Sequence, residues 1–212
     1  MDRKIDEQGA VIGAVEVLLN GPEALRWRQL SLTADEDEVR KQFNESLREI
    51  LPQGVSGEAE HSEGMDSGSG GLSAAIKASG PLGTVTGKRI LLPAFFFSSS
   101  STTQFVAETN RTIPVDLHYV QPGIDDVIYY LPAGFSMESA PQPAQIPAPE
   151  HAVLVTKTTS APGVIDIKHI FAWIFVLMDA KQYPELPAYY QKMATSGQQQ
   201  LVLSHDSTPA TE

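Results

Sequence analysis

The histidines are the first residues to consider for chemistry, because imidazole binds metals and transfers protons near neutral pH. They stand singly, without the close pair on one strand or helical turn that metal sites often use. Their positions are His61, His118, His151, His169 and His205. An offset of two on a strand puts Asp116 and His118 on one face, which leaves open a metal site or a hydrolase built on this pair and neighbouring acids. Surface or half-buried histidines are the simpler interpretation.

Nucleophile and phosphate-binding motifs are not indicated. The chain has no cysteine, which excludes thiolate nucleophiles, disulfides and cysteine-ligated metals. The segment Gly64–Gly68 has its serine one place too late for a nucleophile elbow. In Gly83–Arg89, three residues separate the glycines where a Walker loop has four, so a strand with a turn is predicted there. We therefore expect no enzyme activity, no catalytic residue, no metal and no cofactor.

Aromatic side chains are the remaining candidates for a binding surface. They are Trp27, Phe95-Phe96-Phe97, Tyr129-Tyr130, Trp173 and Tyr189-Tyr190. They can form a platform for a peptide or a sugar, although aromatics in strands more often belong to the core. Three consecutive aromatics cannot all face one way along a strand. At least one of Phe95, Phe96 and Phe97 is therefore expected to face solvent or to cover another surface.

The charge balance and the apolar runs limit the partners. Fifteen basic and 26 acidic residues give a net charge of −11, and nucleic acid is not an expected partner because phosphate binding needs clustered Lys and Arg. The longest apolar run, Ile170–Met178, has nine residues, whereas a membrane-spanning helix needs about 20. No apolar stretch of signal-peptide type follows the charged Met1–Glu7. We expect neither membrane insertion nor a signal peptide.

Most of the elements that must position these residues are predicted to be strands. Turn signals separate apolar or alternating stretches at 10–19, 24–32, 55–63, 72–78, 84–92, 104–120, 126–131, 152–159, 164–175 and 201–203. The first two are predicted to form a hairpin, as are 152–159 and 164–175. In 164–175, Ile165, Ile167 and His169 share one face, and the opposite face is wet. Asp125 and Asp126 are interpreted as turn carboxylates that cap their own backbone.

Two helices are predicted. The first spans about 34–51: a capping-box pattern begins at Thr33, acids occupy its first turn, and Val39, Phe43 and Leu47 fall on one face before Pro52 ends it. The second lies near 184–195. Strands with short turns dominate, so the predicted fold is mainly β (α+β), with antiparallel sandwich-like sheets and two helices packed on them.

The domain prediction is a single β-rich domain over residues 1–204, with two subdomains as the alternative. Their boundary would lie near 96–104, where Phe95-Phe96-Phe97 precede a run of serines and threonines. Residues 205–212 are predicted to be a disordered tail.

Several segments resemble a known family. They include Arg111-Thr112-Ile113-Pro114-Val115-Asp116-Leu117 and Tyr129-Tyr130-Leu131-Pro132-Ala133-Gly134 through Pro141. These segments resemble the C-terminal β-rich region of bacterial transglutaminase-like proteins, those whose N-terminal part carries domain of unknown function three-eight-five-seven. Asp6–Arg28 is similar to the segment after the transglutaminase core, and Tyr183 with Tyr189–Lys192 to the closing helix. About residues 5–203 are covered.

The resemblance implies a β-rich fold and an exported parent protein of the periplasm or cell envelope. The core of that family carries a Cys-His-Asp triad, and a chain without cysteine has no residue that could be its nucleophile. We therefore expect a non-catalytic accessory module with a structural or protein-interaction role, whose partner is a transglutaminase-like core or another envelope protein. The alternative is a stand-alone peptide- or glycan-binding domain.

The residues expected to have structural or interaction roles are Arg28, Phe95, Phe96, Phe97, Arg111, Pro114, Pro132 and Gly134. Arg111 is expected to pair with a carboxylate or to cap carbonyls, and Pro132 with Gly134 to turn the chain out of a strand. An exposed apolar patch near 95–97 would favour the accessory module. An aromatic-lined groove would favour the binding domain, and carboxylates converging with His118 in a pocket would favour a hydrolase.

Overall fold

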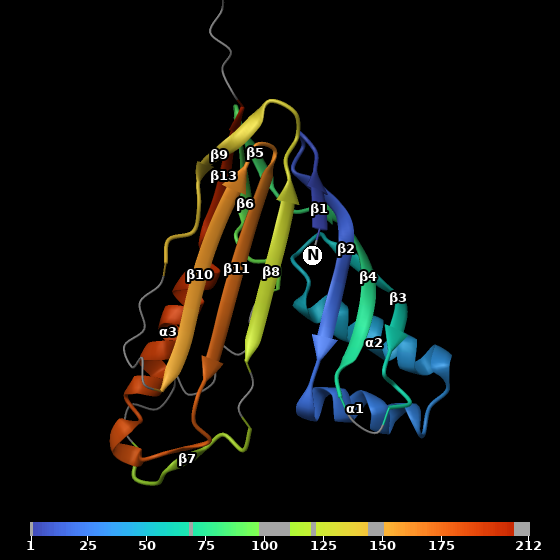
Figure 1. The fold of residues 1–212 in the computed structure, drawn as a ribbon, viewed down its shortest axis with the longest axis vertical. Coiled ribbons are helices and arrows are strands. Elements are labelled where there is room, and N and C mark those ends of the chain that lie inside the picture. Colours follow the sequence, from blue (N-terminus) through green and yellow to red (C-terminus); the bar gives the residue numbers. More distant parts are fainter. Residues whose placement is uncertain (1, 68–69, 98–110, 120–121, 144–150, 206–212) are drawn as a thin grey trace, which may run out of the picture.

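The computed structural model describes residues 2–67, 70–97, 111–119, 122–143 and 151–205 (Figure 1). Its main element is a seven-stranded sheet in which every pair of neighbours is antiparallel except β1 and β8. In spatial order its strands are β10 (Ala152–Ala161), β11 (Val164–Trp173), β8 (Gly123–Tyr130), β1 (Asp2–Ile5), β2 (Ala10–Leu19), β4 (Leu72–Pro81) and β3 (Ser56–Glu63).

Two smaller sheets and three α-helices complete the described part of the fold. The four-stranded sheet contains β5 (Thr84–Thr86), β6 (Arg89–Pro93), β13 (Gln200–His205) and β9 (Phe135–Ser139), and the two-stranded sheet contains β12 (Leu177–Met178) and β7 (Val115–Asp116). The helices are α1 (Gly21–Ser31), α2 (Glu36–Ile50) and α3 (Glu185–Gly197), with a short 3₁₀ helix η2 (Ala180–Gln182).

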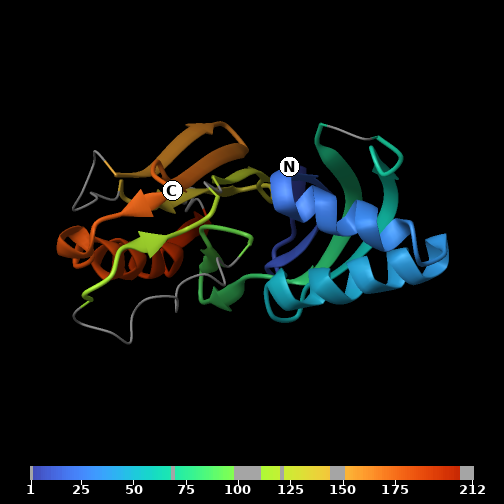
Figure 2. The same cartoon turned by 90° about the horizontal axis from the view of Figure 1, so that it is seen from below.

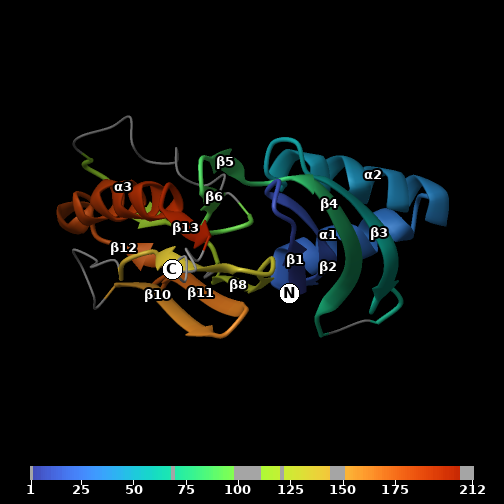
Figure 3. The ribbon, with the colours of Figure 1, turned by 90° about the horizontal axis from the view of Figure 1, so that it is seen from above.

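The seven-stranded sheet has one covered face. Figures 2 and 3 show α2 and α3 on the same side of this sheet, with α2 beside β2, β4 and β3 and with α3 and the four-stranded sheet beside β8, β11 and β10. We call the covered side the inner face. Strand alternation places Ile165 and Ile167 of β11 and Val127 and Tyr129 of β8 in the core. The mainly β, layered α+β class predicted from the sequence is confirmed.

Both predicted helices are present. Asp35 caps α2 by accepting a hydrogen bond from the Glu38 amide at 2.8 Å, and Val39, Phe43 and Leu47 are buried at helical spacing. Helix α2 ends where Leu51 turns extended before Pro52, since proline disfavours the helical conformation in the preceding residue. Helix α3 buries a longer stripe, consisting of Leu186, Tyr189, Tyr190, Met193 and Ser196.

The predicted hairpin of 10–19 with 24–32 is wrong. Residues 21–31 form α1 instead, with Pro22 in the first helical turn, and β2 pairs with β1 and β4. The buried residues Ala24 and Trp27 are three apart, and the Trp27 ring contacts Phe43 edge-on at 5.0 Å. Contact with α2 therefore favours the helix over the strand that the alternation indicated.

Two other strand predictions need correction. The segment 84–92 is a hairpin of β5 and β6 that turns at Gly87, where φ is +61°, which agrees with the strand-and-turn interpretation of Gly83–Arg89. Within 104–120, the described residues 111–119 contain only the two-residue strand β7. Residues 98–110 lie outside the described part of the chain.

Little in the structure bears on the domain prediction. Most of the suggested boundary at 96–104 lies outside the described residues, so one domain or two stays a prediction. His205 does not belong to a tail, because it ends β13 and its amide donates to the Lys88 carbonyl at 2.9 Å. Residues 206–212 lie outside the described part. Among the described helices, none has the length and apolar character needed to cross a membrane.

Candidate functional site

Three buried polar residues form a row across the inner face. In the strand register Thr156 of β10 faces His169 of β11, and His169 faces Asp125 of β8. All three are buried. Because cross-strand partners in neighbouring strands point to the same side of a sheet, their side chains meet on the inner face. We call Thr156, His169 and Asp125 the polar row.

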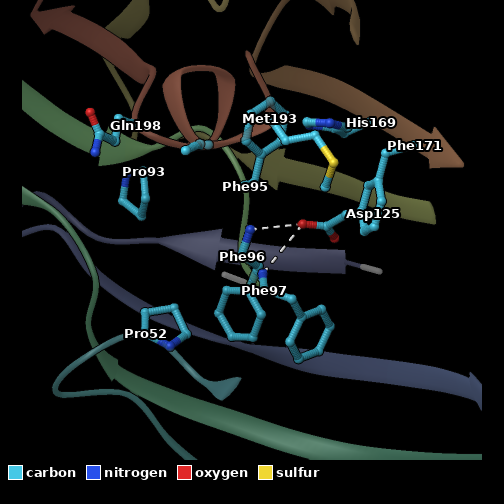
Figure 4. A pocket seen from close by; sticks show the side chains of 12 residues that line it. Pro52, Pro93, Phe95, Phe96, Phe97, Asp125, His169, Phe171, Met193 and Gln198 are labelled. Carbon is cyan, nitrogen blue, oxygen red and sulfur yellow. Dashed lines mark hydrogen bonds between the residues drawn. The ribbon is translucent and has the colours of Figure 1, made fainter. Parts of the chain in front are cut away.

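The segment after β6 covers the polar row. Beyond Pro93 the chain leaves the strand, and the amides of Phe96 and Phe97 donate to Asp125 Oδ2 at 2.9 and 3.3 Å. The Phe95 ring packs edge-on against the His169 ring, with centroids 4.1 Å apart. In Figure 4 the Phe95 ring lies on the His169 side of this segment, and the Phe96 and Phe97 rings lie on the other side.

A cavity of about 300 Å³ opens between this segment, the polar row and the end of α3 (Figure 4). Its described lining is mostly apolar and contains no lysine or arginine. The lining residues are Pro52, Pro93, Phe95, Phe96, Phe97, Asp125, His169, Phe171, Met193, Ala194, Gly197 and Gln198. We call it the aromatic cavity. Its size is at the lower limit for small-molecule sites.

Burial controls the protonation of His169. It lowers the pKa of His169 from 6.5 to about 4, because the charged imidazolium loses its hydration in this apolar surrounding. The ring is therefore neutral at pH 7. Its Nε2 is buried and has no hydrogen-bond partner among the described residues, and the same holds for Thr156 Oγ1 on β10 and Ser196 Oγ on α3. Such unpaired buried atoms are uncommon and are costly to leave unsatisfied.

A second cluster lies on the same face and packs against the middle of α3, and hydrogen bonds pair its indole and phenol groups. Trp173 Nε1 donates to the Tyr190 hydroxyl at 3.2 Å, and the Tyr189 hydroxyl donates to the Val153 carbonyl at 3.0 Å. The Trp173 and Tyr189 rings are tilted against each other, with centroids 4.1 Å apart. Burial raises the pKa of both tyrosines, so both phenols are protonated at neutral pH. We call Trp173, Tyr189 and Tyr190 the aromatic cluster.

The described lining of the aromatic cavity offers mostly apolar surface, the carboxylate of Asp125 and the neutral imidazole of His169. A neutral imidazole can accept or donate one hydrogen bond at Nε2, depending on its tautomer. Among its described lining residues there is no serine, threonine, lysine or cysteine that could act as a nucleophile beside His169. The described residues also contain no group of three or more His, Asp and Glu side chains placed to hold a metal ion.

One family profile matches residues 88–203, and its description is a domain of unknown function with a solved structure, DUF3858. The match covers more than half of the 212 residues. The chain belongs to the DUF3858 family. No curated protein and no solved structure matches the chain. The DUF3858 region contains the polar row, the Phe95–Phe97 segment and the aromatic cluster, and it leaves α1 and α2 outside.

The triple phenylalanine does not form the exposed patch that would favour an accessory module. Phe95 and Phe96 are buried, and Phe97 is half-buried. We expected at least one ring to face solvent or to cover another surface. Phe95 does the latter, because its ring packs on His169. The three rings lie in different surroundings because residues 94–97 are not a strand, so their side chains do not have to alternate between two faces.

Arg28 caps carbonyls at the end of a hairpin. Its Nε donates to the Gly64 carbonyl at 2.9 Å, and its Nη2 donates to the carbonyls of Gly70 and Gly71 at 3.0 and 3.2 Å. Gly64 has a φ of +85°, which glycine adopts without strain. Arg28 therefore joins α1 to the chain that links β3 to β4, which is a structural role outside the DUF3858 region.

The remaining candidate residues lie inside the DUF3858 region, before β7 and between β8 and β9. Arg111 is placed over the Tyr183 ring, with 5.7 Å from Cζ to the ring centroid. Pro114 is exposed just before β7. Between β8 and β9 the Pro132 carbonyl accepts from the Phe135 amide, and Gly134 has a φ of +78°, as expected for a turn.

The Asp116 and His118 pair is a local surface arrangement. The His118 amide donates to Asp116 Oδ1 at 2.8 Å, and His118 Nδ1 lies 3.1 Å from Asp116 Oδ2. Both side chains are exposed, and His118 has a positive φ of 60° that fits a turn. Neither residue lines the aromatic cavity, which therefore gives no support to a hydrolase at His118.

One feature of the sequence points to the polar row. The alternation of 164–169 placed His169 on the same face as Ile165 and Ile167, which is an unusual position for a titratable group. The interpretation of Asp125 and Asp126 as turn carboxylates is wrong. Both lie in β8, where Asp125 accepts from distant amides and Asp126 pairs with Lys168 at 3.0 Å.

Other hollows carry less chemical information. One of about 860 Å³ lies between α2 and β3 and is lined by exposed polar side chains such as His61 and Glu60. Another of about 340 Å³ lies over the aromatic cluster and shares Phe171 and Met193 with the aromatic cavity. No unpaired buried side-chain atom of a described residue lines either one.

Proposed function

We propose that this chain is a non-catalytic accessory module of a transglutaminase-like protein in the cell envelope, and that it binds its partner through an exposed apolar patch. The DUF3858 match supports part of this proposal, because it includes both signature segments that resemble the C-terminal region of those proteins. The absence of cysteine supports a role without the catalytic nucleophile of that family.

The observation that carries the proposal is an apolar patch around the two-stranded sheet of β7 and β12. Five large hydrophobic side chains close to these strands are exposed: Ile113, Tyr119, Ile174, Val176 and Leu177. The two strands pair through Val115 and Met178, and the Leu117 amide donates to the Val176 carbonyl, which holds the two segments together. We call these five side chains the end patch; β7 lies at the lower end in Figure 1.

The end patch coincides with the first signature segment. Residues 111–117 contain Ile113 of the patch and the exposed Pro114, and they supply β7. Scattered exposed hydrophobics are ordinary, but grouped ones mark interaction sites. A signature segment that contributes exposed apolar side chains supports recognition of a protein partner.

A binding titration tests this function. The purified chain is titrated against a purified transglutaminase-like core by isothermal calorimetry. We expect binding by the wild type and a loss of about tenfold or more in affinity for Leu177→Glu, because a charge buried in an apolar interface is costly.

The matched control is Leu18→Glu on β2, since Leu18 and Leu177 are exposed by 64% and 66%. This variant should bind like the wild type. Absence of binding by the wild type, or equal losses for both variants, would rule out the end patch as the interface.

The second candidate function is a peptide-binding domain. The observation that favours it is the aromatic cavity, which meets the condition of an aromatic-lined hollow. Its volume of about 300 Å³ suits one side chain rather than an extended glycan. Binding of short unstructured peptides by the wild type, with no binding by a variant whose cavity is filled, would favour this function.

A further inference from the structure

A groove lies between α2 and β3, outside the DUF3858 match. Strand β3 is the last strand of the seven-stranded sheet, and α2 runs beside it on the inner face (Figure 3). The hollow between the two elements has a volume of about 860 Å³, which is within the range of ligand-binding sites. We call it the α2–β3 groove.

The groove has an apolar floor and a charged rim. The apolar residues that line it are Ala34, Val39, Phe43, Ala59, Met65 and Ala74. Val39, Phe43 and Ala74 are buried, whereas every charged residue of the lining is exposed. The apolar side chains therefore lie at the bottom of the groove, and the charged side chains surround its opening.

Both walls of the groove are held in place by contacts within the chain. The ring of Phe43 packs edge-on against Trp27 with centroids 5.0 Å apart, which joins α2 to α1. Asn44 Oδ1 accepts a hydrogen bond from the Ala59 amide at 2.9 Å, which joins α2 to β3. Because these contacts exist without a ligand, the groove is preformed, and an occupant pays little to order the walls.

Strand addition to β3 is blocked beside the groove. The register between β3 and β4 shifts between Ala59 and His61, so Glu60 has no partner on β4. The Ala59 amide already donates to Asn44. Bulges and covered backbone groups are means by which sheets prevent pairing at an edge. An occupant of the groove therefore binds through its side chains.

The two basic side chains of the lining are already paired. Arg40 Nη2 donates to Asp37 Oδ1 at 2.5 Å, and His61 Nε2 lies 3.3 Å from Glu63 Oε1. Neither Asp37 nor Glu63 lines the groove. Carboxylates outside the groove therefore offset the positive charge at its rim.

Three carboxylates of the rim have no such partner. They belong to Glu36 of α2, Glu60 of β3 and Asp66 beyond β3, and no described residue forms an ion pair with any of them. No three His, Asp or Glu side chains of the described residues are placed to hold one metal ion, so these carboxylates are spread along the rim. A complementary occupant carries more than one positive charge and spans the groove.

We propose that the α2–β3 groove binds a basic peptide segment of a partner protein. An apolar side chain of the segment packs on the floor, and arginine or lysine side chains on either side of it pair with Glu36, Glu60 and Asp66. The long apolar stems of these cations cover the lining while their charged ends reach the rim. The groove and the end patch lie on different elements, so this proposal and the proposed function can fail independently.

The test uses the tripeptide acetyl-Arg-Leu-Arg-amide as the probe and amide chemical shifts of the full chain as the readout. We expect saturable shifts for residues that line the groove. The analogue with citrulline in place of both arginines has nearly the same shape without the charges, and it should bind about fivefold or more weakly. The analogue with serine in place of leucine should bind about threefold or more weakly, because it places no apolar side chain on the floor.

Two pairs of variants locate the site. Ser62→Trp fills the groove from β3 and should abolish binding, whereas Ser56→Trp changes an exposed serine of the same strand that does not line the groove and should leave the affinity unchanged.

The second pair removes two charges in each case. Glu60→Gln with Asp66→Asn should weaken binding about fivefold, because two carboxylates of the rim are lost. Glu45→Gln with Glu49→Gln removes two exposed carboxylates of α2 that do not line the groove, and it should change the affinity by less than about twofold.

Several results would overturn the proposal. Equal losses in the two charge variants would mean that the net negative charge of the chain attracts the probe without a local site. Binding that survives in a folded Ser62→Trp variant would place the peptide elsewhere. Equal affinity for the tripeptide and for putrescine, a diamine with the same charge, would mean that the floor is not used. Failure of the wild type to bind the tripeptide would overturn it as well.

Discussion

The polar row and the aromatic cluster occupy neighbouring parts of one sheet face, under the same helix, and they differ in how their polar atoms are paired. In the aromatic cluster the Trp173 indole and the Tyr189 phenol donate to partners at 3.2 and 3.0 Å. In the polar row His169 Nε2 and Thr156 Oγ1 are buried, and no described residue is a hydrogen-bond partner for either atom. The cluster has the satisfied hydrogen bonds of a structural core, whereas the row retains unused hydrogen-bonding capacity beside a cavity.

This difference predicts opposite effects on stability when side chains of the two regions are replaced. Side chains that fill space and satisfy their polar atoms should lower stability when they are removed. Side chains that leave polar atoms unpaired should cost little or should even stabilise when they are replaced by apolar groups. The variants below test the contrast, beginning with the largest expected effect.

Removal of a ring from the aromatic cluster should have the largest effect. Tyr189→Ala is expected to lower the free energy of unfolding by about 3 to 5 kcal/mol, because a fully buried aromatic side chain leaves a cavity. Urea denaturation followed by circular dichroism measures the change. Tyr130→Ala on β8 is the control, since Tyr130 is 40% exposed and Tyr189 is 1% exposed. Similar losses for the two variants would mean that the cluster does not stabilise the fold.

The pH dependence of stability should reveal His169. Its pKa is about 4 in the folded chain and 6.5 in the unfolded chain, so the unfolded state binds more protons between these values. Above pH 6.5 the ring is mostly neutral in both states, and its titration does not lower the free energy of unfolding. As the pH falls toward 4, the unfolded state is protonated first, and the free energy of unfolding decreases. The loss is of the order of 3 kcal/mol at about 1.4 kcal/mol per pH unit.

Other carboxyl groups titrate in the same range, so His169→Phe is the reference. The difference in unfolding free energy between the wild type and this variant should change across pH 4 to 6.5, with the wild type losing more. Parallel pH profiles would show that His169 is not buried in its neutral form.

The smallest expected effect concerns the unpaired Ser196 hydroxyl on α3. Ser196→Ala should raise the free energy of unfolding by about 0.5 to 1 kcal/mol more than Thr195→Ala. Both changes improve helix propensity by similar amounts, but the Thr195 hydroxyl donates to the Gln191 carbonyl at 2.9 Å, whereas the buried Ser196 Oγ has no partner in the described part of the chain. A lower stability for Ser196→Ala in thermal unfolding would mean that this hydroxyl makes a stabilising contact.

Local sequence patterns predicted α2 but not α1. In α2 the cap at Asp35, the acidic first turn and the spacing of Val39, Phe43 and Leu47 all indicate the same structure. In α1 the alternation around Trp27 resembles a strand as much as a helix. The packing of Trp27 on Phe43 favours the helix, and this contact joins segments whose proximity the local pattern does not contain.

The candidate site was predictable only in part. The alternation along β11 placed His169 on the apolar face, so its burial could be predicted. For Asp125 the sequence offers two adjacent carboxylates after a Pro-Gly pair, and the strand register with β11 decides which one faces inward. The Phe95–Phe97 segment could not be placed, because its partner Asp125 lies 28 to 29 positions away.

The sequence by itself determined the chemical limits of this protein and much of its local structure. No cysteine means no thiolate chemistry, and the spacing of apolar residues determined α2, α3 and the inward faces of most strands. Only the tertiary structure decided that Phe95 meets His169, that Asp125 binds the amides of Phe96 and Phe97, and that a cavity remains between them. The physical reason is that periodicity specifies which face of an element is buried, whereas strand register and layer packing specify what that face contacts.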